Sequence, residues 1–442
     1  LELLAQHDIK AYPLNKNAKV NGKVFAKEHS YYIPVKQPQA RLILSVFSEQ
    51  TSFLDNTFYD VSSWNLAMAF NLDFAKVESK RAVKVANNAW QKASTSTPVL
   101  TENAYSYAID WADYQAPALV YALLEEGIQL RTALKPFGAS TSAGEQNFAA
   151  GTILVNAGLQ KGDWYNKFIN TVSQFSVPVT DIKSGLTATG IDLGSRNMMP
   201  VTKPNILVVG GFGANPYEVG ETWYLMDRHL GVSPTIIEKR WLSRTDLAKY
   251  THIILTDGSY SKADDKLLSK LKAWVKKGGV LWSQKRAAIW LAKENVLESE
   301  FMDQKGMKEN FDTAGLKYGD QEALAGRQRI AGAFFETKLD LTHPLAFGFS
   351  RDTLPLFKNR TEILTTPKKP FIEVASYTDK PLLSGYADDI NVKEISKASG
   401  LIAHGYGSGV VIGMTDNPNF RAITYGTNRL LFNALFLGKA ID

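Results

Sequence analysis

The sequence predicts an α/β protein with a parallel sheet, and three apolar runs between residues 205 and 290 predict it. Asn205–Gly213 reads NILVVGGFG, a β-branched run that ends in glycines. Thr251–Gly258 (THIILTDG) and Gly278–Gln284 (GGVLWSQ) follow it, each after a helical pattern. Strands that alternate with helices of about 10–15 residues indicate a parallel sheet. We therefore expect a flavodoxin-like arrangement in this part of the chain.

A similar order of elements is visible earlier, starting at Tyr105. YSYAIDW, IQLRTALKPF, GTILVNAG and VPVTDIKSG read as strands, and PALVYALLEEG and DWYNKFINTVSQFS read as helices. Gly127 and Gly231 each follow the first helix of a unit, where a glycine in the left-handed conformation commonly ends a helix. We therefore expect two similar parallel-sheet modules, flavodoxin-like or amidotransferase-like, in which Gly151–Gly158 and Thr251–Gly258 are equivalent central strands.

The length of 442 residues favours more than one domain. We expect an α+β segment at residues 1–100, a first α/β module at 101–200 and a second α/β domain at 204–442. Within the first segment, Asn21-Gly22 predicts a hairpin turn, and the polar stretch Asn87–Pro98 reads as a linker. At the other end, TNRLLFNALFLG reads as a helix with an apolar face.

Composition excludes several classes of function. The chain has no cysteine, which excludes disulfides, thiolate zinc sites and cysteine nucleophiles. The net charge of +6 is small for this length and the lysines are scattered, so we expect no nucleic-acid partner. No apolar run is long enough to span a bilayer, so we expect no membrane partner. The opening residues, LELLAQHDIK, read as the end of a helix, and we expect the chain to be a piece of a longer protein.

No local metal motif is present. None of the histidines has a second histidine or a glutamate at ligand spacing. We therefore expect no metal site in this chain. The six histidines are His7, His29, His229, His252, His343 and His404.

A ligand crevice is expected where the parallel strands end, because open α/β sheets bind ligands beyond the carboxyl ends of their strands. The glycines after the first strand lack the full dinucleotide-binding pattern, since Pro216 occupies its last place. Acidic residues at strand ends also cap helices, as Asp110 or Asp257 would. The candidate crevice residues are Gly211, Gly213, Glu221, Asp257, Gly258, Ser283 and Gln284.

One corner of that crevice decides between two functions. In amidotransferase-like sheets a cysteine or serine lies on the sharp turn after a central strand, and here that turn reads Ser283-Gln284-Lys285-Arg286. A serine nucleophile needs a base within hydrogen-bond reach, and no histidine follows closely. We expect no catalytic residue and a binding crevice. The alternative is a self-standing hydrolase or transferase that uses Ser283.

Six phrases of the sequence, taken together, resemble the region after the peptidase domain in long bacterial zinc carboxypeptidases, the carboxypeptidase-A-like metallopeptidases. The phrases are FYDVSSWNLAMAFN, KPF, GIDLGS, GETWYLMDR, THPLAFGF and NPNFRAITYGTNRLLFNALF. The resemblance implies that the chain ends in a class I glutamine-amidotransferase-like domain. It also implies a secreted or periplasmic parent protein that removes C-terminal residues from peptides.

The family's zinc ligands, a His-x-x-Glu and a later histidine, have no matching position in this chain. The resemblance therefore implies that zinc is held only by a peptidase domain upstream, and that this chain is a non-catalytic accessory or ligand-binding region. The implied partners are that peptidase domain and, at the strand carboxyl ends, a peptide or glycan.

Overall fold

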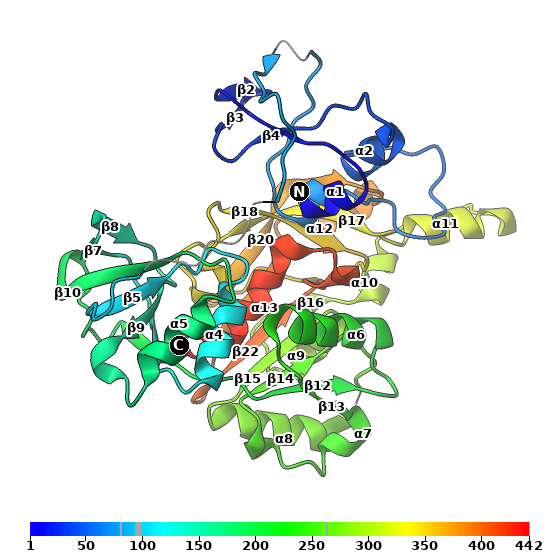
Figure 1. Ribbon diagram of the computed structural model, residues 1–442. Helices are drawn as coiled ribbons and strands as arrows, with labels where there is room; N and C mark the ends of the chain where they lie inside the picture. The colour runs from blue at the N-terminus through cyan, green and yellow to red at the C-terminus, as the bar shows by residue number, and fades with distance from the viewer. Residues whose placement is uncertain (80–81, 93–99, 262–263, 442) are drawn as a thin grey trace.

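The computed structural model describes residues 1–79, 82–92, 100–261 and 264–441. Two large sheets form its framework, one of eleven strands and one of seven. In Figure 1 the N-terminal segment (blue) lies over the end of the larger sheet that carries β17 and β20, and the seven-stranded sheet (cyan to green) lies to one side.

The larger sheet is parallel in one half and antiparallel in the other. Its parallel strands, in spatial order, are β13 (Thr235–Glu238), β12 (Ile206–Gly210), β14 (His252–Leu255), β15 (Val280–Gln284) and β22 (Gly409–Met414). The antiparallel strands continue as β21 (Ser399–Tyr406), β20 (Glu373–Ser384), β17 (Ala333–Leu339) and β18 (Thr353–Lys358), with β16 (Phe301–Met302) and β19 (Ile363–Leu364) beside them. Every residue of β12, β14, β15 and β22 is buried, as expected for parallel strands covered on both faces.

Helices cover both faces of the parallel half. On one face, alternate strand residues such as Leu207 and Ile253 pack against α8 (Asp265–Lys276) and α9 (Arg286–Lys293). On the other face, Val208 and Trp282 pack against α13 (Tyr425–Leu437), α6 (Pro216–Leu225) and its continuation η3 (Met226–Leu230). The remaining helices of the domain are α7 (Lys239–Leu242), α10 (Gln304–Glu309), α11 (Gln321–Arg327) and α12 (Asp389–Ile395). The predicted α/β class is confirmed, and the parallel strands lie in the part of the chain where they were predicted.

The seven-stranded sheet differs from the prediction in strand direction. Its order is β11 (Met198–Val201), β6 (Leu130–Ala133), β9 (Ile153–Asn156), β5 (Ser106–Ile109), β10 (Val179–Gly190), β7 (Phe137–Thr141) and β8 (Gly144–Phe148). Strand β9 pairs antiparallel with β5 and β6, whereas β14 pairs parallel with β12 and β15. The expected equivalence of Gly151–Gly158 and Thr251–Gly258 is therefore wrong. Apolar alternation specifies a strand but not its direction, and the β7–β8 hairpin lies between β6 and β9 in the chain.

Local predictions in the N-terminal segment fare better. Strands β2 (Ala18–Val20) and β3 (Lys23–Phe25) form the expected hairpin, with positive φ angles of 49° at Asn21 and 82° at Gly22. The segment also contains β1 (Tyr12–Pro13), β4 (Tyr31–Tyr32), α1 (Glu2–Gln6), α2 (Ala40–Val46) and α3 (Leu66–Ala69). Residues 93–98 of the expected linker lie outside the described residues. The domain boundaries stay a prediction.

Helix α13 connects the two sheets. Helices α4 (Ala116–Glu125) and α5 (Trp164–Val172) pack on the smaller sheet, in the same apolar cluster as α13. The guanidinium of Arg429 donates to the carbonyls of Trp111, Ala112 and Asp113, which follow β5. One turn later, Asn433 accepts from the Trp111 indole (2.8 Å) and donates to two carbonyls of the 345–347 turn. These bonds fix the smaller sheet against the parallel domain.

Candidate functional site

The sharp turn after β15 is centred on Lys285, not on Ser283. Lys285 has φ 51° and ψ −123° and precedes α9, and its N–H donates to the Met414 carbonyl at 2.7 Å. Such a backbone conformation is rare for a residue with a side chain and costs about 1–3 kcal/mol. Ser283 is a fully buried residue within β15, and its hydroxyl donates to the Ile412 carbonyl at 2.8 Å. A nucleophile must be exposed to substrate, and Ser283 is not. The hydroxyl that the hydrolase alternative would use instead forms a hydrogen bond between two strands.

The side chain of Lys285 turns back into the protein and forms an ion pair with Glu218 of α6. Its ammonium group also donates to Asn359 Oδ1 at 2.7 Å. Lys285 and Glu218 are each only 3% exposed. The second oxygen of Glu218 accepts from Gln284 Nε2 (2.7 Å) and from the N–H of Asp257 (3.2 Å). The corner is therefore closed by an ion pair whose hydrogen-bonding capacity is used internally.

Asp257 forms a second ion pair beside the first. Its two oxygens accept from Arg286 Nε (2.7 Å) and Nη2 (2.9 Å). Burial raises the pKa of Asp257, but the Arg286 hydrogen bonds and the nearby positive charges outweigh burial, and the pKa lies below its usual value. Asp257 also accepts from the N–H of Arg286 at the start of α9 (3.3 Å). Asp257 thus holds the start of α9, the helix after the next strand, and not the start of α8, the following helix that the capping alternative names.

The glycine-rich loop after β12 rests directly on the end of β14. The N–H of Ser259 donates to the carbonyl of Gly213 at 2.7 Å, and a Cβ on Gly258 would lie 2.7 Å from that same oxygen. Gly211 has a φ of 76° and abuts the Glu238 side chain. These glycines allow two backbones to touch. The loop and the end of β14 are therefore in direct contact at Gly213 and Gly258, and the ligand crevice stays a prediction.

Glu221 lies one turn along α6 from Glu218, at the end of β22. It accepts from the side chain of Asn417 and from the N–H of Arg421 (2.8 Å). Burial raises the pKa of Glu221 to about 7, and the charge of Glu218 adds to this shift. Arg421 pairs with Asp60 of the N-terminal segment at 2.6 Å. The loop after β22 is thus connected to the N-terminal segment.

Glu218, Asn417 and Arg421 were not among the residues predicted for this site, and Lys285 was predicted on the turn after the strand but without its ion pair. The spacing of Glu218 and Glu221 could have indicated that both face the same side, because residues three apart on a helix share a face. The partners of these glutamates come from distant loops, which no local pattern brings together.

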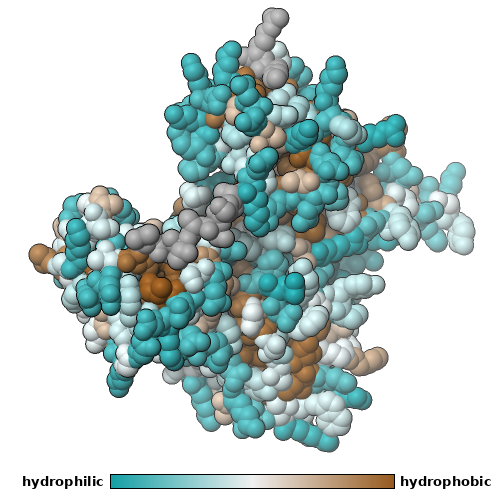
Figure 2. Space-filling model, viewed as in Figure 1, coloured by the Kyte–Doolittle hydropathy of each residue, from teal (hydrophilic) through white to brown (hydrophobic). Residues whose placement is uncertain are grey.

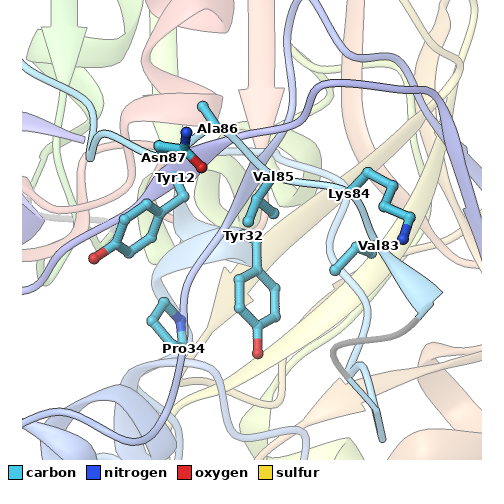
Figure 3. Close-up of a pocket in the computed structure, with 8 residues that line it drawn as sticks. All are labelled: Tyr12, Tyr32, Pro34, Val83, Lys84, Val85, Ala86 and Asn87. Carbon is cyan, nitrogen blue, oxygen red and sulfur yellow. The ribbon is translucent and has the colours of Figure 1, made fainter.

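Two hollows lie away from the carboxyl ends of the parallel strands. One, of about 650 Å³, is in the N-terminal segment, and Figure 3 shows the rings of Tyr12, Tyr32 and Pro34 on its wall together with residues 83–87. The other, of about 490 Å³, lies between α4, α5 and η3. On the face drawn in Figure 2, hydrophobic residues gather in small separate patches on a mostly hydrophilic surface.

Metal and membrane features can be stated for the described residues. Among them, no three His, Asp or Glu side chains converge as a metal site would require. In the same residues, no helix combines the length and apolarity needed to cross a bilayer.

No protein-family model matches the chain, and no curated protein matches it in sequence. Solved structures with a similar fold include a glutamine amidotransferase from Thermotoga maritima (13% identity, TM-score 0.29, 54% of this chain and 85% of that one). A protein described as ThuA-like from Bacteroides uniformis is similar at 13% identity and TM-score 0.29, over 52% of this chain and 88% of that one. A β-galactosidase from Bacillus circulans sp. alkalophilus is similar at 12% identity and TM-score 0.31, over 63% of this chain and 35% of that one. The similarity is one of fold alone.

Proposed function

We propose that this chain is a non-catalytic accessory region of a zinc metallocarboxypeptidase-like protein, secreted or periplasmic. The observation that carries the proposal is the residue at the turn after β15. Where an amidotransferase-like sheet would present its nucleophile, this chain has Lys285, and that side chain is paired with Glu218 and Asn359.

The chemistry of this corner favours a binding or structural role over a catalytic one. Covalent catalysis needs a nucleophile with a base within hydrogen-bond reach. Ser283 donates to a backbone carbonyl, and His404, on β21 two strands away, accepts from the N–H of Glu298 at 3.1 Å. The ion pair of Lys285 also lies where a substrate would have to enter. The internal hydrogen bonding of this corner favours a role in holding the peptidase domain over one in binding a peptide or glycan there.

The peptidase parent, its zinc and its location rest on the sequence resemblance. Two of the resembling phrases lie in the structure around the strand edge. GETWYLMDR contains Glu221 of α6, and NPNFRAITYGTNRLLFNALF contains its partners Asn417 and Arg421. The phrases therefore meet in space at Glu221, which is consistent with a shared structural role for them.

The test compares this chain with the longer gene product. Reading the coding sequence upstream of Leu1 should reveal a His-x-x-Glu and a later histidine. The longer protein should hold one zinc per chain and release the C-terminal residue of hippuryl-phenylalanine or hippuryl-arginine, and this chain alone should do neither after washing with a chelator. An upstream sequence without those ligands, or one tightly held zinc in this chain alone, would overturn the proposal.

A comparison of the wild type with one variant, Ser283→Ala, tests the hydrolase alternative in this chain. Hydrolysis of glutamine and of p-nitrophenyl acetate should be at background for the wild type and for Ser283→Ala. Enzymatic turnover that falls by about a hundredfold in Ser283→Ala, with folding intact, would show that the corner is catalytic.

A further inference from the structure

The hollow between the two sheets has the size and lining of a binding site. Its volume is about 490 Å³, within the range of about 300–1,000 Å³ that is usual for small-molecule pockets. Its walls come from α4, from the end of α5 and from η3, so helices of the smaller sheet and of the larger sheet both line it. Figure 1 shows α4 and α5 beside the smaller sheet, on the side of α13. Pockets at such domain interfaces are common binding sites.

The wall formed by η3 is a π-helix, which extends α6 by five residues. Single π-turns of this kind are rare and occur frequently at functional sites. Gly231, with a φ of 71°, ends the turn. The wide turn places Asp227, Arg228 and His229 beside the hollow.

A chain of hydrogen bonds orients the imidazole of His229. Asn428 lies with its amide nitrogen 3.0 Å from the Pro418 carbonyl and 2.9 Å from Asn419 Oδ1, so its oxygen accepts from the Tyr114 hydroxyl at 2.9 Å. The Tyr114 oxygen then accepts from Nδ1–H of His229 at 3.3 Å. This tautomer leaves Nε2 of His229 with a lone pair, and Nε2 has no hydrogen-bond partner among the described residues.

The rest of the lining combines flat apolar surfaces with hydrogen-bonding side chains, and the charged Asp227 and Arg228 contribute one charge of each sign. The rings of Tyr121 and Phe175 lie among the amides of Gln115 and Gln174. The two glutamates of the lining are each paired: Glu125 lies 2.5 Å from Lys203, and Glu126 lies 3.5 Å from Lys167. A charged ligand would have to compete with these pairs. A ligand with apolar C–H faces and many hydroxyls would meet a ring and an amide at once.

We propose that this interdomain pocket binds a neutral saccharide, one hydroxyl of which donates to Nε2 of His229. The site is separate from the strand edge and does not depend on the function proposed for that edge. Saccharide binding at this site is also independent of zinc, so its test can fail or succeed whatever the outcome of the test for the peptidase parent.

The pH dependence follows from the same imidazole. Burial lowers the pKa of His229, and the charge of Arg228 lowers it further, so the ring is neutral at pH 7 and Nε2 accepts. Below that pKa the ring is protonated and Nε2 becomes a donor, so affinity should fall once the pH drops below the lowered pKa of His229. The titratable groups around the ring are Tyr224, Asp227 and Arg228 from α6 and η3, Tyr114, Glu125 and Glu126 from the α4 side, and Tyr425 from α13.

The experiment titrates the intact chain with glucose, galactose, mannose, N-acetylglucosamine and their β-1,4-linked disaccharides, by calorimetry at pH 7.5. At least one should bind with a Kd of about 0.1–1 mM, as expected for a small neutral ligand. His229→Phe should weaken that binding at least tenfold, because phenylalanine keeps the edge-to-face contacts with Tyr114, Tyr224 and Tyr425 but removes the acceptor.

Two further variants separate binding from folding. His229→Gln supplies an oxygen acceptor and should retain more affinity than His229→Phe. His29→Phe, at an exposed histidine of the N-terminal segment, should leave the Kd unchanged. Failure of all these saccharides at 10 mM, equal binding by His229→Phe, or binding of adenosine or of anionic sugars in place of neutral ones would overturn the proposal.

Discussion

The closed corner at Lys285 and the pocket at His229 are both rich in polar groups, yet they differ in what those groups still have to offer. At the corner, Lys285 and Glu218 are 3% exposed and bond to each other and to Gln284, Asn359 and the Asp257 backbone. In the pocket, one ring nitrogen of His229 has no partner in the part of the chain that the structure describes, and it lies beside a cavity of about 490 Å³. A cluster of charges is thus a poor indicator of a site. Unused hydrogen-bonding capacity next to open space is a better one.

The largest effect is expected when the corner loses one half of its ion pair. Glu218→Ala leaves the buried Lys285 charge unpaired and should lower the free energy of unfolding by about 3–5 kcal/mol. Urea denaturation followed by circular dichroism measures the loss. The double variant Glu218→Leu, Lys285→Met should recover most of it, because two apolar side chains need no partner. A loss below about 1 kcal/mol for Glu218→Ala would show that the corner is solvated.

Asn433 tests how firmly the two sides of the pocket are held together. Asn433→Ala leaves the Trp111 indole N–H and the carbonyls of Leu345 and Phe347 without their hydrogen-bond partner. It should lower the free energy of unfolding by about 2–4 kcal/mol. Hydrogen exchange should rise at the loop after β5. Asn166→Ala, at an exposed residue of α5, serves as the control. Unchanged exchange in that loop would mean that α13 does not join the two sheets.

Titration of Glu221 should make the stability of the protein depend on pH. Its folded pKa of about 7 lies above the usual value of 4.5, so the folded state holds the proton more tightly than the unfolded state. The contribution to stability is complete below about pH 4.5 and is lost as pH rises through 7, by about 1–3 kcal/mol. Glu221→Gln should flatten the change in unfolding free energy between pH 5 and pH 8. An identical pH profile for the variant would place Glu221 in ordinary solvent.

The smallest effect is expected for Ser283→Ala. The variant removes one buried hydrogen bond to Ile412 and should cost about 0.5–1.5 kcal/mol. Thermal unfolding measures it. A loss above about 3 kcal/mol would show that Ser283 belongs to the ionic network rather than to the strand pair alone.

The sequence predicted those features that depend on neighbouring residues. The parallel strands β12, β14 and β15 were readable because strands buried on both faces are continuous apolar runs. Gly127 and Gly231 adopt the left-handed conformation that their positions predicted, with φ angles of 79° and 71°.

What the sequence could not predict depends on contacts between distant segments. The direction of β9 follows from its pairing with β5 and β6, which the apolar pattern does not encode. Lys285 binds Glu218, 67 positions away, and Tyr114 contacts His229, 115 positions away. The candidates Asp257, Ser283 and Gln284 do lie at the strand ends. The sequence does not reveal that their polar groups are already satisfied.

The most direct test of the closed corner is the reactivity of Lys285 in the native protein. Reductive methylation with formaldehyde, followed by peptide mass spectrometry, gives a rate for each lysine. The buried ion pair predicts that Lys285 reacts about a hundredfold more slowly than the exposed Lys266, at a rate close to that of the fully buried Lys358. If Lys285 were instead among the first lysines to be methylated, the corner would be open and available to a ligand or substrate.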